Sequence, residues 1–166
     1  AGSIPYNDHT FDIILANHML YHVPDMKIVI SEIARVLKDD GVFYATTMEQ
    51  DYMKEMGGLI REFRSLPPGG KRANGVIERF SLENGKELLN EFFRSVDLKI
   101  YENSLSVSES GPLTDYALSL NSITPGRVVL DESDKNRFNE FIYMKIRENG
   151  NISISANAGV FVCHIR

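Results

Sequence analysis

The sequence predicts an α/β fold in which helices cover a sheet. A short, continuous apolar run from Asp12 to Ala16 is typical of a strand buried on both faces. A helical pattern follows it, and Val42 to Thr47 begin a second strand. Strand, helix and strand at this length form a right-handed crossover unit with a parallel strand pair. The composition agrees, because 43% hydrophobic and 25% charged residues in 166 are ordinary for one globular domain.

The helix of the crossover unit is predicted from its cap and its apolar stripe. Pro24 and Asp25 stop the preceding loop, and Asp25 is suited to cap the helix. The apolar stripe that faces the sheet consists of Met26, Ile30, Ile33, Ala34 and Leu37. The charged residues that fall largely on the other sides are Lys27, Glu32, Arg35 and Lys38. Asp39, Asp40 and Gly41 are predicted to form the turn into the second strand, with Gly41 in the left-handed conformation.

Further elements follow along the chain. We expect a helix over 48–66, a loop rich in proline, glycine and basic residues, and a helix over 82–93 with Ser81 as its cap. Val96 to Val107 alternates as a strand, and 152–165 forms the last one. Between them lie two helical patterns, over 113–120 and over a segment that begins near Asp131. We therefore interpret 1–166 as one domain, with 108–150 as a helical insertion or lid between the last two strands.

Charge and cysteine content restrict the class of protein. The net charge of -5, from 18 basic and 23 acidic residues, gives no electrostatic footprint for nucleic acid or for an anionic membrane. No apolar run approaches the roughly 20 residues that a membrane span needs. The single cysteine, Cys163, excludes a disulfide within the chain. We expect a cytoplasmic protein with a small-molecule substrate, and no nucleic-acid or membrane partner.

Residues Phe11 to Thr47 resemble the second half of the class I S-adenosylmethionine-dependent methyltransferase core. The segment from Ala1 to Tyr6 is similar to the family's Asp-Ala-x-x-Leu-Pro-Phe loop, from its second residue onward. The resemblance implies a Rossmann-like fold, S-adenosylmethionine as cofactor and a last strand antiparallel to its neighbours. In that family a glycine-rich cofactor loop comes before this segment. Because the sequence shows none there, we expect the chain to hold the C-terminal part of the domain only.

The resemblance also implies a set of cofactor-binding residues. Ser3 and Ile4 correspond to the loop that approaches the adenine, and Asn17, His18 and Met19 correspond to residues that line the methyl donor. The Asn-Pro-Pro-Tyr signature of many methyltransferases acting on nucleic-acid bases or protein glutamine is absent, since Asn17 is followed by His-Met-Leu. A small-molecule acceptor is therefore favoured.

Two histidines are candidates for a general base. An imidazole titrates near neutral pH, so His22 or His18 could take a proton from a hydroxyl or an amine. In the alternative interpretation, His22 orders the loop through a backbone hydrogen bond and His18 packs beside the cofactor. His9 and His164 are interpreted as structural, and the spacing of histidines and cysteine does not favour a metal site.

Basic residues near the Pro-Pro-Gly-Gly loop have two interpretations. Lys71, Arg72 and Arg79 could grip a carboxylate or phosphate of a substrate, or they could be solvated loop residues.

Three hypotheses for the function remain open. The first is methyl transfer to a small molecule. Another Rossmann-like enzyme would need a nucleotide-phosphate loop, which the sequence lacks. A non-catalytic interaction or scaffold module that keeps half of the fold is the third.

An association through the sheet edge is also predicted. In the family, the strand equivalent to 12–16 has the glycine-loop strand as a neighbour. Without that neighbour, the strand would expose an apolar edge, and we expect a homodimer or another association that buries Ile13, Ile14 and Leu15.

Overall fold

The computed structural model describes residues 2–65, 76–123 and 129–165, which divide into two compact units. Unit 1 comprises the chain up to Tyr52, Val76–Glu102 and Asn157 onward. Unit 2 comprises Met53–Gly75 and Asn103–Ala156. Predicted residues 108–150 fall within unit 2. The two units are described separately.

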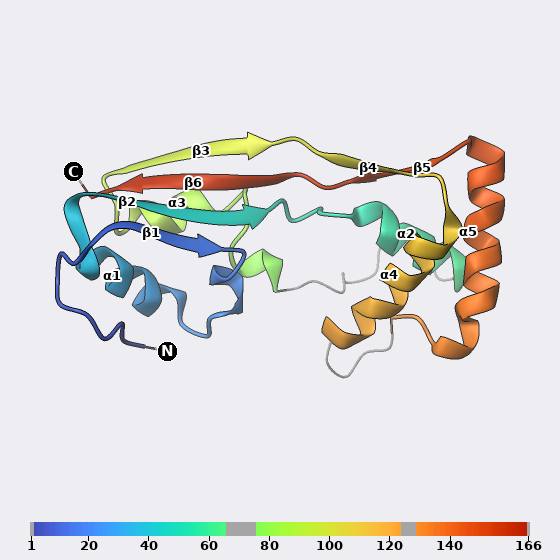
Figure 1. Cartoon of the computed structure of the whole chain (residues 1–166), viewed down its shortest axis with the longest axis horizontal. Coiled ribbons are helices and arrows are strands. Elements are labelled where there is room, and N and C mark those ends of the chain that lie inside the picture. Colours follow the sequence, from blue (N-terminus) through green and yellow to red (C-terminus); the bar gives the residue numbers. More distant parts are fainter. Residues whose placement is uncertain (1, 66–75, 124–128, 166) are drawn as a thin grey trace. The chain divides into compact units, whose positions relative to one another are not determined.

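Unit 1 contains a four-stranded mixed sheet (Figure 1). Its strands, in spatial order, are β1 (Phe11–Asn17), β2 (Leu37–Met48), β6 (Ala158–His164) and β3 (Ser95–Tyr101). β1 and β2 are parallel and are joined by helix α1 (Met26–Val36), whereas β6 is antiparallel to both β2 and β3. The predicted crossover unit and the antiparallel last strand are confirmed.

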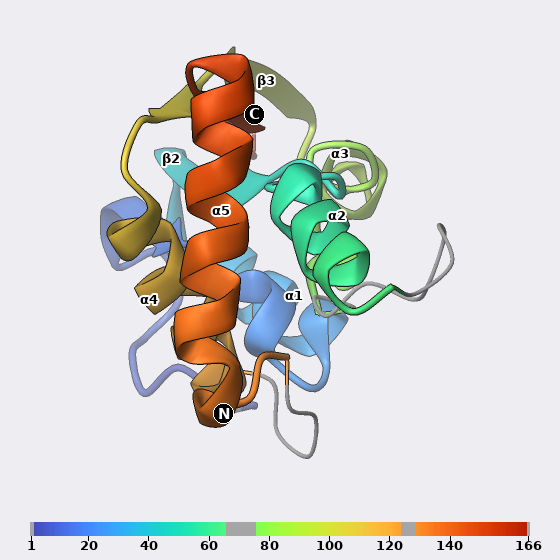
Figure 2. The same cartoon turned by 90° about the vertical axis from the view of Figure 1, so that its right-hand side faces the viewer.

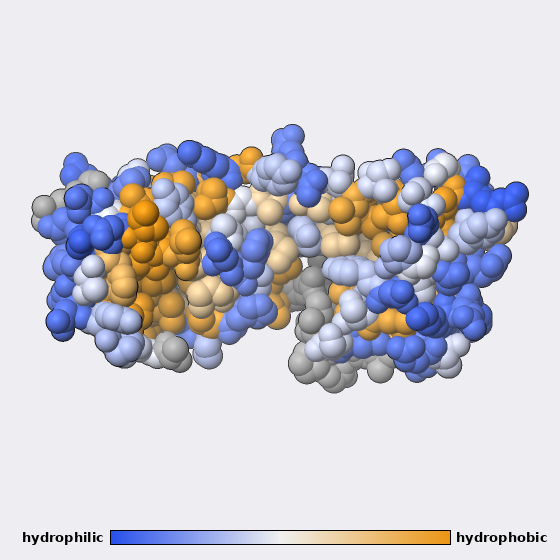
Figure 3. Space-filling model, in the orientation of Figure 1, coloured by the Kyte–Doolittle hydropathy of each residue, from blue (hydrophilic) through white to orange (hydrophobic). Residues whose placement is uncertain are grey.

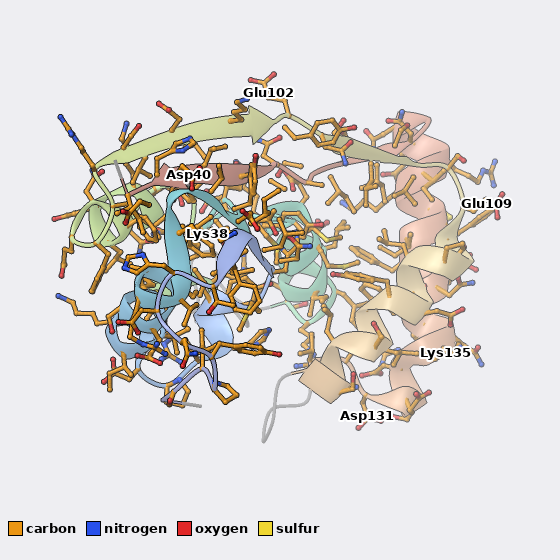
Figure 4. The ribbon with its side chains drawn as sticks, turned by 60° about the vertical axis from the view of Figure 1, so that its left-hand side comes forward. Lys38, Asp40, Glu102, Glu109, Asp131 and Lys135 are labelled. Carbon is orange, nitrogen blue, oxygen red and sulfur yellow. The ribbon has the colours of Figure 1, made fainter. Side chains whose placement is uncertain are left out.

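Helix α1 begins and packs as its sequence predicts. The Asp25 carboxylate accepts a hydrogen bond from the Ile28 N–H at 3.1 Å, which satisfies one of the free donors of the first turn. Ile30 and Ile33 of the predicted stripe are buried in the core of unit 1, and Met26 and Ala34 are half-buried against it. Leu37, also placed in the stripe, is buried in that core but already belongs to β2. At the other end, the Lys38 ammonium lies 2.8 Å from the Asp12 carboxylate of β1 (Figure 4).

The predicted turn after this helix is wrong. β2 already begins at Leu37 and includes Asp39 to Gly41, and Gly41 does not have a positive φ. The reason for a glycine there is close packing. A Cβ at Gly41 would lie 2.8 Å from Leu37 Cδ1 and 3.0 Å from the Asp12 carbonyl oxygen.

The prediction that β1 is buried on both faces is also wrong. α1 and helix α3 (Gly85–Asn90) contribute to a core on one face of the sheet, where Ile14 and Ala16 of β1 lie. Ile13 and Leu15 are 59% and 61% exposed, because side chains of a strand alternate between faces and no described residue buries the second face of β1. Figure 3 shows apolar residues gathered over this part of unit 1. Association through this edge stays a prediction.

The core of unit 1 combines both ends of the sequence. Phe43 of β2 stacks on Phe93 with ring centroids 5.5 Å apart, and Phe80 meets Phe161 of β6 edge to face at 5.6 Å. Cys163 is fully buried, and this burial, together with Asp97, raises the pKa of its thiol to about 12. The thiol therefore acts as a small apolar core side chain.

Two long predicted strands are each divided. The segment from Val96 to Val107 forms β3 and β4 (Ser104–Val107), and 152–165 forms β5 (Ile152–Ser155) and β6. β4 and β5 pair in an antiparallel ladder of their own, within unit 2. The side-chain oxygen of Asn103 accepts a hydrogen bond from the Ser104 N–H, and the main-chain carbonyl of Asn103 accepts one from the Ala156 N–H. These hydrogen bonds lie at the break between β3 and β4, which the sequence predicted as one strand.

Two predicted helices are shorter than expected. Helix α2 (Lys54–Phe63) replaces the predicted 48–66, since β2 continues to Met48. α3 replaces 82–93, and Ser81 does not cap it through its side chain. Instead, the Asn84 amide oxygen accepts the Ser81 N–H at 2.8 Å, and the Ser81 carbonyl accepts the Gly85 N–H.

In unit 2, α2, α4 (Ser110–Ile123) and α5 (Lys135–Asn149) pack with the β4–β5 ladder (Figure 2). α4 and α5 confirm the two predicted helical patterns. A 3₁₀ turn, η3 (Glu132–Asp134), precedes α5, and the Asp131 carboxylate caps it by accepting the Ser133 N–H at 2.8 Å. The shared core is formed mainly by Met56, Ile60, Leu113, Ala117, Leu130, Phe138, Ile142 and Ile154. Within the described ranges, no helix has the length and apolar character needed to cross a membrane.

Gly85 provides a test of the packing in unit 1. A Cβ at this position would lie 2.5 Å from Phe161 Cε2 and 2.7 Å from Cζ. Gly85→Ala should therefore lower the free energy of unfolding by about 1–3 kcal/mol, as overpacked cores do. Urea denaturation followed by circular dichroism measures it. Gly58→Ala in α2 is the control, since its Cβ would meet nothing within 4 Å. A Gly85→Ala protein as stable as the wild type would contradict this packing.

Candidate functional site

The candidate site lies at the edge where the parallel strands β1 and β2 both end. Asn17 is the last residue of β1 and is paired in register with Thr46 of β2. His18 and Met19 follow directly, and all three side chains are exposed. Ligands of open α/β sheets bind beyond this edge of the strands. Asn17, His18 and Met19 therefore lie at this edge, and their role in cofactor binding stays a prediction.

His18 has a constrained backbone. Its φ is 49°, which is uncommon for a residue other than glycine. Its N–H donates to the Thr46 carbonyl at 3.3 Å and to the Thr46 hydroxyl at 3.0 Å. The end of β2 therefore holds His18 in a conformation that costs on the order of 1–3 kcal/mol, and such strain often occurs at functional sites.

His22 ends a short 3₁₀ turn, η1 (Leu20–His22). Its N–H donates to the Met19 carbonyl at 3.0 Å, while its side chain is exposed. The imidazole lies against the ring of the buried Tyr21, with centroids 4.6 Å apart. The backbone bond agrees with an ordering role, and the exposed imidazole leaves the general-base role open.

Arg79 anchors the loop that carries His22. It ends the 3₁₀ turn η2 (Ile77–Arg79), and its guanidinium donates to the Val23 carbonyl and, at 2.8 Å, to the Pro24 carbonyl. These bonds hold the chain directly after His22, although Arg79 itself is exposed. Lys71 and Arg72, the other two basic candidates, lie outside the described residues.

Polar residues after β2 form a second group near this end of the sheet. The Asn157 amide donates to the Glu49 carboxylate at 3.0 Å, and the Glu49 N–H donates to the Asn157 carbonyl at 3.3 Å. The Gln50 N–H donates to the Glu83 carboxylate at 3.1 Å. Sequence analysis missed these residues because the partners are 108 and 33 positions apart and no local pattern joins them.

Tyr21 is a further group that the sequence did not single out. Burial raises the pKa of its phenol, and Tyr52, which follows β2, adds to that effect. The phenol therefore stays protonated at neutral pH and can donate a hydrogen bond. Its position between His18 and His22, in one loop, is the sequence signal that could have identified Tyr21.

The N-terminal segment lies along α1. Ser3 is exposed, and Ile4 is half-buried against the core of unit 1. The Ile4 N–H donates to the Glu32 carboxylate at 3.0 Å, and the Arg35 guanidinium also holds this carboxylate. These bonds, first those from Arg35 and then that from Ile4, lower the pKa of Glu32 to about 2. The pattern placed Glu32 and Arg35 on the outer sides of the helix, so sequence analysis gave them no role.

Metal ligands are not gathered in the described part of the chain. No three histidine, cysteine, aspartate or glutamate side chains there come close enough to hold a metal ion. The edge offers the exposed imidazoles of His18 and His22 and the exposed amide of Asn17, which suit binding and proton transfer.

Comparison with known proteins connects this edge to one family. Residues 1–45 match the family described as "Methyltransferase domain". The chain is 44% identical over 109 residues to the "Uncharacterized methyltransferase YcgJ" of Bacillus subtilis strain 168. That match covers 63% of this chain but only 42% of the relative.

Solved structures show the same fold. The crystal structure of Bacillus subtilis YcgJ superposes with a TM-score of 0.52 and 18% identity, over 99% of this chain and 68% of the other. Protein BH2331 of Bacillus halodurans C-125, named as a candidate methyltransferase, gives a TM-score of 0.54 at 15% identity, over 97% and 72%. At such identities the likeness shows the fold alone.

The low pKa of Glu32 predicts an acid-dependent contribution to stability. The ordinary pKa of the carboxyl is 4.5 and the folded value is about 2, so the contribution is complete above about pH 4.5. It should fall between pH 4.5 and 2, as the unfolded chain takes up the proton first. Urea unfolding of the wild type and of Glu32→Gln at several pH values measures it. Their difference should shrink toward pH 2, and a difference independent of pH would contradict the assignment.

Proposed function

We propose that this chain, which carries class I methyltransferase sequence and fold, takes part in S-adenosylmethionine-dependent methyl transfer to a small-molecule acceptor. The main support is that the segment that matches the methyltransferase domain contains Asn17, His18 and Met19, which lie at the carboxyl edge of the β1–β2 pair. The matched part spans less than half of the curated relative.

The residues at this edge fit the proposed cofactor. Met19 and Asn17 present an exposed thioether and an amide beside the end of β1, and neither adds positive charge next to a cationic sulfonium. Ser3 and the half-buried Ile4 offer a hydroxyl and an apolar side chain for the adenine side. When bound, S-adenosylmethionine supplies the activated methyl group. The protein has to position the acceptor in line with it and, where the acceptor is protonated, remove a proton.

His22 is the proposed general base. Its imidazole is exposed beside the edge, and the loop is held on both sides: by the Met19 carbonyl before it, and by Arg79 on the Val23 and Pro24 carbonyls after it. Such anchoring keeps an imidazole in one place, as proton transfer over hydrogen-bond distance requires. His18, fixed by Thr46, is the alternative base.

Cofactor binding tests the proposal directly. S-adenosylhomocysteine should bind to the protein as its gene encodes it with a micromolar Kd, measured by calorimetry. Absence of binding to the gene-encoded protein would contradict methyl transfer and favour a non-catalytic interaction module.

The base hypothesis has a test of its own. His22→Ala should reduce turnover by about 10²–10⁴-fold and remove the acidic limb of the pH–rate profile, along which protonation of a general base lowers the rate. The acceptor is first identified by screening small molecules with labelled cofactor. His9→Asn is the control, because His9 is equally exposed, lies before β1 and pairs with Asp39 at 3.4 Å. Near-normal turnover of His22→Ala with an unchanged profile would remove His22 from the mechanism.

A further inference from the structure

We propose that Glu32 and Arg35 of α1 act as positioning residues for the cofactor, because they clamp the Ser3–Ile4 segment and so set the affinity for the adenosyl group. This inference rests on the proposed function. It concerns two residues that do not touch the cofactor themselves. Their effect passes through the backbone of Ile4.

The contacts of Arg35 use its whole guanidinium. Nε and Nη2 donate to the two carboxylate oxygens of Glu32, at 2.9 and 2.8 Å. Nη2 also donates to the Ile4 carbonyl at 3.0 Å, and Nη1 donates to the Tyr6 carbonyl at 2.9 Å and the Asp8 carboxylate at 2.6 Å. Five bonds equal the number of N–H donors that an arginine has. A side chain on a solvated helix face has no need of such a fixed arrangement.

The peptide groups of Ile4 are held on both sides. The Ile4 N–H donates to Glu32, and the Ile4 carbonyl accepts from Arg35. The Ile4 carbonyl also accepts the Tyr6 N–H at 2.8 Å, and the Tyr6 ring packs against Phe11 at 4.8 Å. Ser3 and Ile4 therefore have a defined place along α1 before any ligand arrives, which reduces the ordering cost of binding.

Followed from Asp8 back to Gly2, the N-terminal segment runs along α1 from the last turn of the helix toward the first turn. Asp8 is held at Arg35, Ile4 at Glu32, and a Cβ on Gly2 would lie 3.8 Å from Ile28. α1 begins just after the loop that carries His22, at the carboxyl edge of the sheet (Figure 1). The clamp thus directs Ser3 toward the edge where Asn17 and Met19 lie.

A second ion pair, which joins Lys27 of α1 to Glu91 at the end of α3, serves as a comparison. Lys27 donates to both carboxylate oxygens of Glu91, at 2.9 and 2.6 Å, but these side chains are 61% and 44% exposed. Arg35 and Glu32 are 31% and 20% exposed. The Lys27–Glu91 pair makes no contact with the N-terminal segment among its described hydrogen bonds. It is therefore a control for the exchange of the two residues of an ion pair that involves α1.

The competing explanation is that Glu32 and Arg35 only stabilise α1. Oppositely charged residues three positions apart support a helix by about 0.2–0.5 kcal/mol. An exchange of the two residues separates the explanations. Glu32→Arg with Arg35→Glu keeps an ion pair on the helix, but places a guanidinium opposite the Ile4 N–H and a carboxylate opposite the Ile4 carbonyl. Helix support survives this exchange, and the clamp does not.

The experiment measures S-adenosylhomocysteine binding by calorimetry, and hydrogen exchange of the Ile4 amide, in the gene-encoded protein. Arg35→Lys should weaken binding about tenfold, since an ammonium has only three donors. The exchanged double variant should keep the circular dichroism spectrum of the folded protein, lose protection of the Ile4 amide and bind at least as weakly as Arg35→Lys. The control exchange, Lys27→Glu with Glu91→Lys, should leave Kd within about twofold of the wild type.

The outcomes distinguish the inference from the function on which it rests. Wild-type affinity in the exchanged double variant, or a fully protected Ile4 amide, would overturn the clamp and leave methyl transfer in place. If the wild-type protein itself fails to bind S-adenosylhomocysteine, the proposed function is wrong and this inference falls with it.

Discussion

The parallel pairing of β1 with β2 is the constraint on which the candidate site depends. A parallel pair needs a crossover, and α1 provides it, so both strands end at the same edge of the sheet. The register Asn17 to Thr46 places the loop after β1 directly beside the end of β2. The positive φ of His18 follows from that register, because its N–H reaches two oxygens of Thr46. A slip of one residue would move these two acceptor oxygens away and exchange the two faces of β1.

The same sheet buries one face of β1 and exposes the other. Ala16 lies in the core with Phe43 and Phe161, whereas Ile13 and Leu15 remain exposed in the described part of the chain. The continuous apolar run of β1 predicted two buried faces, since a strand within a doubly covered sheet reads that way. The apolar composition of β1 is therefore typical of a strand that is covered on both faces, whereas the described residues cover one face only.

Local signals predicted the elements well where one short stretch contains all the information. The Asp25 cap and the buried Ile30 and Ile33 are examples, because a cap bond or a helical stripe involves neighbours within one or two turns. The division of 96–107 into two strands was not predictable in this way. It depends on the Asn103 carbonyl meeting the Ala156 N–H, which is 53 positions away. The local trace of the break is a change of phase, from apolar residues at 96, 98 and 100 to apolar residues at 105 and 107.

The amino-acid sequence by itself determined the crossover unit, the resemblance to class I methyltransferases, and the placement of Asn17, His18 and Met19 after a strand. Only the tertiary structure decided what holds them and their surroundings: Thr46 at His18, Arg79 at the His22 loop, and Arg35 with Glu32 at Ile4. These partners lie between 28 and 56 positions apart in the chain. Such contacts obey no short period, since side chains of separate elements meet only after the sheet and α1 have brought them together.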